Sequence, residues 1–122
     1  MKPKKVLIVD DHAEIRKLIR ITLGKNVTTL EAADGPTALD VIRAHHPDVV
    51  VLDVMMPGNI DGLGVLDAIR ADQAVPQPRV IMVMARGQAR DYADGMARGA
   101  DRYFIKPFSP LELAAAIREY LQ

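Results

Sequence analysis

Val-Val-Val-Leu-Asp at positions 49–53 is a run of four branched apolar residues that ends in a carboxylate. A continuous apolar run of this length, rich in β-branched residues, is typical of a strand that is buried on both faces of a parallel sheet. Segments 6–9 and 80–84 have the same character, and segments 27–32 and 102–105 are weaker candidates for a second or an edge strand. The sequence therefore predicts five strands, three of them buried on both faces.

Patterns typical of amphipathic helices separate these apolar runs. An apolar stripe from Ile15 to Leu23 predicts the first helix, and Gly24 is a natural end for it. The last helix has the clearest start, because Ser109 and Glu112 have the spacing of a capping box. A second helix is expected to begin at Asp34-Gly35-Pro36, with Pro36 near its first turn. Two more helices are expected, one over 63–70 and one over 88–98. Five strands alternating with five helices predict a doubly wound α/β fold with helices on both faces of the sheet.

The composition indicates one domain of ordinary globular character. The 122 residues fit a single compact domain, which we place at 1–122. Lys and Arg together number 16, as do Asp and Glu, so the formal net charge is zero and there is no electrostatic footprint for DNA or RNA. Cysteine is absent, and no apolar run is long enough for a signal peptide or a membrane span. These features predict a soluble, cytoplasmic protein that binds neither nucleic acid nor membrane.

Charged residues follow three of the expected strands. Asp10 and Asp11 come after the first strand, Asp53 ends the third, and Lys106 follows the fifth. Ligands of doubly wound folds bind at the carboxyl ends of the strands, so neighbouring strands would bring these side chains to one edge. An acid after a strand also often caps the next helix, and Asp11 could do so for a helix that starts near Ala13. Clustered carboxylates, however, repel one another and favour a bound cation, and Mg²⁺ suits them because it can also hold a phosphate oxygen.

Four fragments together resemble the receiver domains of response regulators, and the resemblance covers nearly the whole chain. Each fragment is weak alone, but their order and spacing are specific. The fragments are Val-Leu-Ile-Val-Asp-Asp at 6–11, Val-Leu-Asp-Val-Met-Met-Pro at 51–57 followed by Asp61-Gly62, Gly-Ala-Asp at 99–101, and Tyr-Phe-Ile-Lys-Pro-Phe at 103–108. The resemblance implies a flavodoxin-like fold, in which five parallel strands in the order 2-1-3-4-5 are covered by five helices.

The resemblance also implies a role for each matching residue. Asp53 would accept a phosphoryl group and Lys106 would pair with it, with a cis peptide bond after the lysine. Mg²⁺ would be held by Asp10, Asp11, Asp53 and the backbone carbonyl of Met55. The phosphoryl donor would be a histidine kinase or a histidine phosphotransfer protein, and the domain would be a phosphoryl acceptor rather than a turnover enzyme. A downstream protein partner would bind the face formed by the fourth helix, the fifth strand and the fifth helix.

The sequence departs from the family at the end of the fourth strand, where members usually carry Thr or Ser. Met84 occupies this position, and no Ser or Thr occurs from residue 38 to residue 108. In the family, the hydroxyl group donates a hydrogen bond to the phosphoryl group, and an aromatic residue, here Tyr103, then turns inward. A thioether cannot donate a hydrogen bond, and Met84 is long enough to fill the space that Tyr103 would enter.

The sequence leaves three interpretations of Met84 open. It disables the switch, or the domain signals by another route or relays phosphate without a surface change, or Met84 fills the core without consequence. The alternative function is therefore a degenerate receiver that acts as a phosphorylation-independent interaction module. Equal affinity for a partner with and without a phosphoryl mimic would distinguish this module from a working switch.

Two other interpretations of the first acidic segment are less favoured. A turnover phosphatase with an aspartyl nucleophile would carry a second Asp two residues after that nucleophile, whereas this chain has Asp10-Asp11-His12. His12 could be a metal ligand or a base, but its position favours a polar residue at the start of the first helix.

Overall fold

One parallel sheet forms the centre of the computed structural model, which describes residues 3–56, 60–85 and 89–122. The strand order is β2-β1-β3-β4-β5, as the family resemblance implied. Neighbouring strands are parallel throughout, so their carboxyl ends lie along one edge. The strands are β1 (Lys5–Val9), β2 (Thr28–Ala32), β3 (Val49–Asp53), β4 (Arg79–Ala85) and β5 (Arg102–Lys106).

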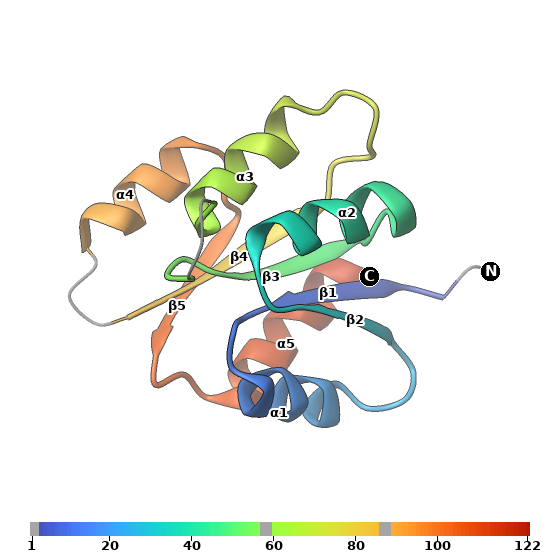
Figure 1. Cartoon of the computed structure of the whole chain (residues 1–122). Helices are drawn as coiled ribbons and strands as arrows, with labels where there is room; N and C mark the ends of the chain where they lie inside the picture. Colours follow the sequence, from blue (N-terminus) through green and yellow to red (C-terminus); the bar gives the residue numbers. More distant parts are fainter. Residues whose placement is uncertain (1–2, 57–59, 86–88) are drawn as a thin grey trace.

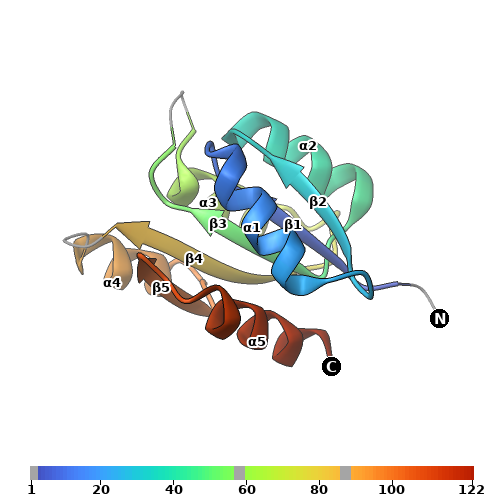
Figure 2. The ribbon, with the colours of Figure 1, turned by 90° about the horizontal axis from the view of Figure 1, so that it is seen from below.

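Five helices cover the two faces of this sheet, as the alternating pattern predicted. Figure 1 shows α2 and α3 on one face with α4 beside α3, and Figure 2 shows α1 and α5 together on the other face. The helices are α1 (Ala13–Leu23), α2 (Gly35–His45), α3 (Gly62–Ala71), α4 (Ala89–Ala97) and α5 (Pro110–Leu121). Within the described residues, none of these helices has the length and apolar character that crossing a membrane requires.

Alternate residues of the central strands point into two hydrophobic cores, one on each face of the sheet. In β1, Leu7 and Val9 belong to the core under α2 and α3, whereas Val6 and Ile8 belong to the core under α1 and α5. All five residues of β3 are buried, which confirms the prediction that this strand is covered on both faces. Each fully buried Val or Leu contributes about 1.5–3 kcal/mol, so a slip of β3 that exposed them would be costly. The apolar residues therefore fix the position of the carboxylate that ends β3.

Side-chain oxygens of Asp34, Asp61 and Ser109 accept hydrogen bonds from backbone N–H groups at the starts of α2, α3 and α5. The last of these confirms the predicted cap of the fifth helix. At α1 the N-cap is His12 and not Asp11, and the side chain of His12 makes no capping hydrogen bond. The interpretation of Asp11 as the cap of this helix is therefore wrong.

The register of the strands brings the charged residues that follow them to one edge. Val9 is aligned with Leu52, so the acids after β1 and the acid that ends β3 are neighbours across the sheet. On the other side of β3, Ala85 of β4 is aligned with Lys106 of β5. This edge is where doubly wound sheets bind their ligands.

Candidate functional site

Asp53 lies at the carboxyl end of β3, and 3% of its surface is exposed. Its Oδ1 accepts a hydrogen bond from the backbone N–H of Met55 at 3.2 Å. Its Oδ2 accepts one from Nζ of Lys106 at 3.3 Å. The peptide bond between Lys106 and Pro107 is cis, as expected. Both oxygens of this buried carboxylate therefore have a partner, one of which carries a positive charge.

Asp10 shares the same ammonium group, because its Oδ2 lies 3.4 Å from Nζ of Lys106. The other oxygen of Asp10 accepts a hydrogen bond from the backbone N–H of His12 at 2.8 Å. Nδ1 of His12 lies 3.2 Å from Oδ1 of both Asp10 and Asp11. The contacts thus run from Asp11 through His12, Asp10 and Lys106 to Asp53, with acidic and basic side chains alternating. Sequence spacing alone does not indicate this order.

Burial and neighbouring negative charge disfavour the ionised form of Asp53. The pKa of Asp53 is raised from 3.8 to about 6, first by burial and then by the negative charge of Asp10, although Lys106 and the Met55 N–H act in the opposite direction. Burial lowers the pKa of Lys106, but the carboxylates of Asp53 and Asp10 outweigh it, so the net shift is upward. Three carboxylates beside one lysine leave an excess of negative charge that a divalent cation would neutralise.

The donor set fits a hard divalent cation. Asp10, Asp11 and His12 each offer one ligand atom, and these three atoms lie within 4.8 Å of one another. Carboxylate oxygens are the ligands that Mg²⁺ prefers, so the predicted ligands Asp10, Asp11 and Asp53 fit this ion. Met55 contributes its backbone N–H to Asp53, and the role of its carbonyl oxygen as a ligand stays a prediction.

Gly62 lets α3 begin directly behind the carboxylate of β3. Its N–H donates a hydrogen bond to the carbonyl oxygen of Val54 at 3.0 Å. A Cβ atom on Gly62 would lie 2.3 Å from the carbonyl oxygen of Asp53 and 2.6 Å from Cα of Val54. Both are backbone atoms, so only a shift of α3 or of the end of β3 could make room, and the observed close approach of α3 to Asp53 therefore depends on glycine. The sequence marked Asp61-Gly62 only as part of the family motif, and the structure supplies the physical reason.

Arg16 of α1 supports the site, although the sequence analysis did not single it out. Its Nη1 donates a hydrogen bond to the carbonyl oxygen of Asp10 at 2.7 Å, and its Nε donates one to Oε1 of Glu31 at 2.9 Å. The guanidinium group therefore ties the segment after β1 to both α1 and β2. The only signal in the sequence is a basic residue on the polar side of the first helical turns, a pattern that surface helices commonly show.

Met84 and Tyr103 lie on the same face of the sheet but differ in exposure. Met84 is 1% exposed and belongs to the core under α2 and α3, whereas Tyr103 is 36% exposed. The register aligns Met82 with Tyr103 and Met84 with Ile105. The ring of Tyr103 packs on Tyr92 of α4, with ring centroids 4.2 Å apart and planes inclined by 53°. The thioether therefore fills the interior while the aromatic ring lies outside against α4.

Several large apolar side chains remain exposed on α4, β5 and the start of α5. They are Tyr92, Met96, Tyr103, Ile105 and Leu111. This surface, called here the α4–β5–α5 face, is the one on which the family resemblance placed a protein partner. Exposed apolar residues gathered over neighbouring elements are typical of interaction surfaces.

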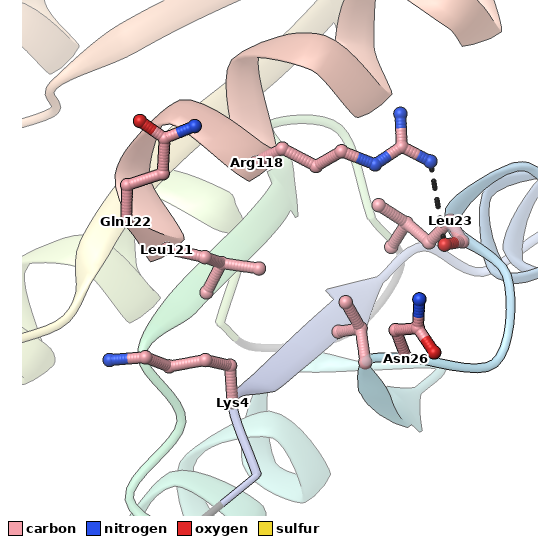
Figure 3. Close-up of a pocket in the computed structure, with 7 residues that line it drawn as sticks. Lys4, Leu23, Asn26, Arg118, Leu121 and Gln122 are labelled. Carbon is pink, nitrogen blue, oxygen red and sulfur yellow. Dashed lines mark hydrogen bonds between the residues drawn. The ribbon is translucent and has the colours of Figure 1, made fainter.

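A separate hollow lies near the two ends of the chain, where the strands begin (Figure 3). Its lining residues are Lys4, Leu23, Asn26, Val27, Arg118, Leu121 and Gln122. Arg118 donates hydrogen bonds to the carbonyl oxygens of Thr22 and Leu23 at 3.0 and 3.4 Å, and thereby caps the end of α1. No Asp or Glu is among these seven residues, so the hollow is not a candidate for cation binding or phosphoryl transfer.

Fold and site together define a flavodoxin-like domain with an acid–lysine site at the carboxyl edge of its sheet. The family model described as the response regulator receiver domain matches residues 6–118. The chain is 47% identical over 120 residues to a probable transcriptional regulator, ycf27, of Guillardia theta, with 98% of this chain and 46% of the relative covered. It is 38% identical over 120 residues to the DNA-binding response regulator MtrA of Mycolicibacterium paratuberculosis, with 98% and 52% covered.

The solved structure of a putative response regulator from Chloroflexus aurantiacus has the same fold. Its TM-score is 0.88 at 32% identity, and 98% of each chain is covered. This chain therefore belongs to the response regulator receiver domain family, whose members act in two-component signalling. It spans about half the length of the curated relatives that it matches.

Proposed function

We propose that this domain accepts a phosphoryl group on Asp53 from the phosphohistidine of a histidine kinase or a histidine phosphotransfer protein. The observation that carries this proposal is the contact of Lys106 with both Asp53 and Asp10 at the carboxyl edge of the sheet. Asp10, Asp11, Asp53 and the carbonyl of Met55 would hold Mg²⁺, which when bound neutralises charge on the transferring phosphoryl group. The domain acts in the cytoplasm as a phosphoryl acceptor and not as a turnover enzyme.

The residues of the chain provide a nucleophile and a cation for the transfer. A carboxylate oxygen of Asp53 forms a bond to phosphorus while the bond from phosphorus to the donor nitrogen breaks, which leaves an acyl phosphate and a free histidine. Such a transition state is largely dissociative, so positioning and charge neutralisation matter more than proton abstraction. Lys106, already 3.3 Å from Oδ2 of Asp53, supplies a point charge for the phosphoryl oxygens.

Incubation with acetyl phosphate and Mg²⁺, followed by intact-protein mass spectrometry, tests the acceptor role. We expect one phosphoryl adduct that hydroxylamine removes, as is typical of an acyl phosphate. Asp53→Asn should give no adduct, whereas Asp40→Asn, which changes an exposed carboxylate on α2, should be labelled like the wild type. An adduct that persists in Asp53→Asn, or no adduct in the wild type, contradicts the proposal.

We propose further that the output is protein binding through the α4–β5–α5 face and that Met84 impairs its coupling to the phosphoryl group. The support is that Met84 is fully buried, offers no hydrogen-bond donor, and lies on the same face of the sheet as Tyr103. Tyr103 is packed on Tyr92 at the surface, so an inward turn of its ring would break this contact. Without a hydroxyl group that follows the phosphoryl group, nothing at position 84 drives the turn.

The same observations favour a second function, a phosphorylation-independent interaction module. In that case the α4–β5–α5 face binds its partner in a fixed conformation. The affinity for a protein partner with and without beryllofluoride separates the two functions, because only a switch changes it. These 122 residues have a formal net charge of zero, so they carry no overall excess of positive charge for DNA binding. If the whole protein binds DNA, as the name of the MtrA relative states for that relative, we propose that residues outside these 122 make the contact.

A further inference from the structure

We infer that His12 is a ligand of the metal site and raises the preference of this site for transition-metal ions that favour imidazole, such as Co²⁺ and Zn²⁺, over Mg²⁺. This inference rests on the proposed acidic metal site and concerns one further residue of it. The sequence favoured a polar helix-start role for His12, and the structure gives its ring a different set of contacts.

The ring of His12 faces the acids and not the helix it precedes. His12 is the N-cap of α1, yet its side chain accepts no hydrogen bond from the first turn. Its Nδ1 instead lies 3.2 Å from Oδ1 of Asp10 and 3.2 Å from Oδ1 of Asp11. One nitrogen equidistant from two carboxylate oxygens completes a set of three ligand atoms within 4.8 Å. A cation that enters between the two carboxylates therefore meets this nitrogen as a third donor.

The surroundings hold Asp10 more firmly than they hold His12. Asp10 is buried, with Lys106 on its Oδ2 and Arg16 on its backbone carbonyl. The side chain of His12 is 59% exposed, so its ring can tilt by the small amount that a nitrogen–metal bond needs. Neutral imidazole offers either ring nitrogen to a metal, provided that the proton is carried by the other.

The chemistry of the donor set distinguishes this site from one made only of oxygen atoms. Carboxylates, carbonyls and water suit Mg²⁺, whereas imidazole suits zinc, nickel, copper and iron. Affinity for Co²⁺ exceeds that for Mg²⁺ at many sites, so the informative quantity is the change in this preference when the imidazole is removed.

The test compares the wild type with His12→Phe and His12→Gln at one fixed pH. Phe keeps a ring but removes the nitrogen, and Gln replaces it with an oxygen donor. His45→Phe is the matched control, because His45 is an exposed histidine at the end of α2. Calorimetric titration with Mg²⁺ and with Co²⁺ gives the preference for Co²⁺ of each protein. Histidine-selective NMR of the Co²⁺-loaded wild type identifies the histidine ring whose signals are shifted by the paramagnetic ion.

We expect His12→Phe and His12→Gln to lower the preference for Co²⁺ over Mg²⁺ on the order of tenfold, with His45→Phe unchanged. The His12 ring signals alone should show a large paramagnetic shift. An unchanged preference in both His12 variants overturns the inference, as does an equal loss of both metals, which would indicate a structural role. If the wild type binds neither Mg²⁺ nor Co²⁺, the proposed metal site itself fails, whereas Mg²⁺ binding without a contribution from His12 leaves that site intact.

Discussion

Nζ of Lys106 lies 3.3 Å from Oδ2 of Asp53, although the two residues are 53 positions apart in the sequence. The same ammonium group lies 3.4 Å from Oδ2 of Asp10, so one lysine side chain pairs with two buried carboxylates. Taking charges out of water is expensive, and a shared lysine compensates two carboxylates only in part. The arrangement that suits phosphoryl transfer therefore lowers the stability of the metal-free domain.

Replacing Asp53 with Asn should stabilise the metal-free domain at neutral pH. The folded-state pKa of Asp53, about 6, is above its ordinary 3.8, so the folded state binds the proton more tightly than the unfolded state. The stability that protonation provides is fully present below about pH 4 and is lost as the pH rises through about 6. We expect Asp53→Asn to gain about 1–3 kcal/mol at pH 7 and little near pH 4. Urea unfolding with a chelator present measures the difference.

Asp40→Asn is the control for that measurement, because it removes an exposed carboxylate on α2. Its free energy of unfolding should stay within about 0.5 kcal/mol of the wild type across the same pH range. If Asp53→Asn is no more stable than the wild type at pH 7, burial of the ionised carboxylate does not destabilise the folded domain.

Gly62→Ala should disturb the site through the backbone. The added Cβ would meet the carbonyl oxygen of Asp53 at 2.3 Å, and a shift of α3 or of the end of β3 would have to relieve the clash. We expect a loss of about 1–3 kcal/mol in stability, together with slower labelling by acetyl phosphate. Gly64→Ala, two residues further along the same helix, meets only side-chain atoms at 3.0 Å or more. It should be neutral or slightly stabilising, since Ala favours helix over Gly. Equal effects of both variants would refute the argument.

Arg16→Met should weaken Mg²⁺ binding without removing a ligand. The guanidinium group holds the carbonyl oxygen of Asp10, and its loss would free the segment that carries the acid pair. A hydrogen bond from a charged donor contributes about 1.5–3 kcal/mol, so a decrease in affinity of roughly tenfold is expected by calorimetry. Arg20→Met also breaks an ion pair with Glu31 but does not touch Asp10. The control should retain the wild-type affinity, and a comparable decrease in both variants would indicate only a general charge effect.

Tyr92 and Tyr103 should be energetically coupled. A double-mutant cycle with Tyr92→Leu and Tyr103→Leu isolates the pair, and we expect about 0.5–1.5 kcal/mol of coupling from urea unfolding. As a control, a double-mutant cycle with Tyr120→Leu and Tyr103→Leu should show no coupling energy, because the ring of Tyr120 lies near Arg79 instead. Coupling near zero between Tyr92 and Tyr103 would mean that the contact does not hold Tyr103 at the surface.

The layers of the fold could be predicted from the sequence because the pattern is strong and local. The apolar runs at 6–9, 49–52 and 80–84 are typical of central strands, and the Ser109 cap indicated the start of the last helix. The order of the strands came from the family resemblance, since alternation of strands and helices does not order a sheet. The convergence of Asp10, Asp53 and Lys106 was predicted from their positions after apolar strands, provided that those strands were neighbours, and the resemblance added their roles. The structure brings these three side chains together.

Contacts made by single side chains could not be predicted in the same way. The ring of His12 turns to the acids because of the local backbone after β1, which leaves no trace in the spacing of residues. Arg16 looks like any basic residue on a solvated helix face until β2 and Asp10 are placed around it. The packing of Tyr92 on Tyr103 depends on how closely α4 approaches β5, which hydrophobic periodicity does not determine.

Met84→Thr should restore the coupling between the acidic site and the α4–β5–α5 face. The hydroxyl group supplies a donor, and the shorter side chain opens space behind Tyr103. The change removes buried apolar volume from a residue that is 1% exposed, so we expect it to cost about 1–3 kcal/mol of stability, measured by urea unfolding. Met84→Ala should carry a similar cost in stability but restore no coupling, because it opens space without a donor.

Amide NMR spectra with Mg²⁺, recorded before and after addition of beryllofluoride, test the central claim most directly, because this ion mimics a phosphoryl group on an aspartate. For the wild type we predict shifts at Asp10, Asp53 and Lys106 that stop short of Tyr92 and Tyr103, and for Met84→Thr shifts that reach both tyrosines. Shifts at the tyrosines in the wild type would contradict the claim that Met84 uncouples the surface from the site. No response near Asp53 in either protein would contradict the claim that the domain accepts a phosphoryl group.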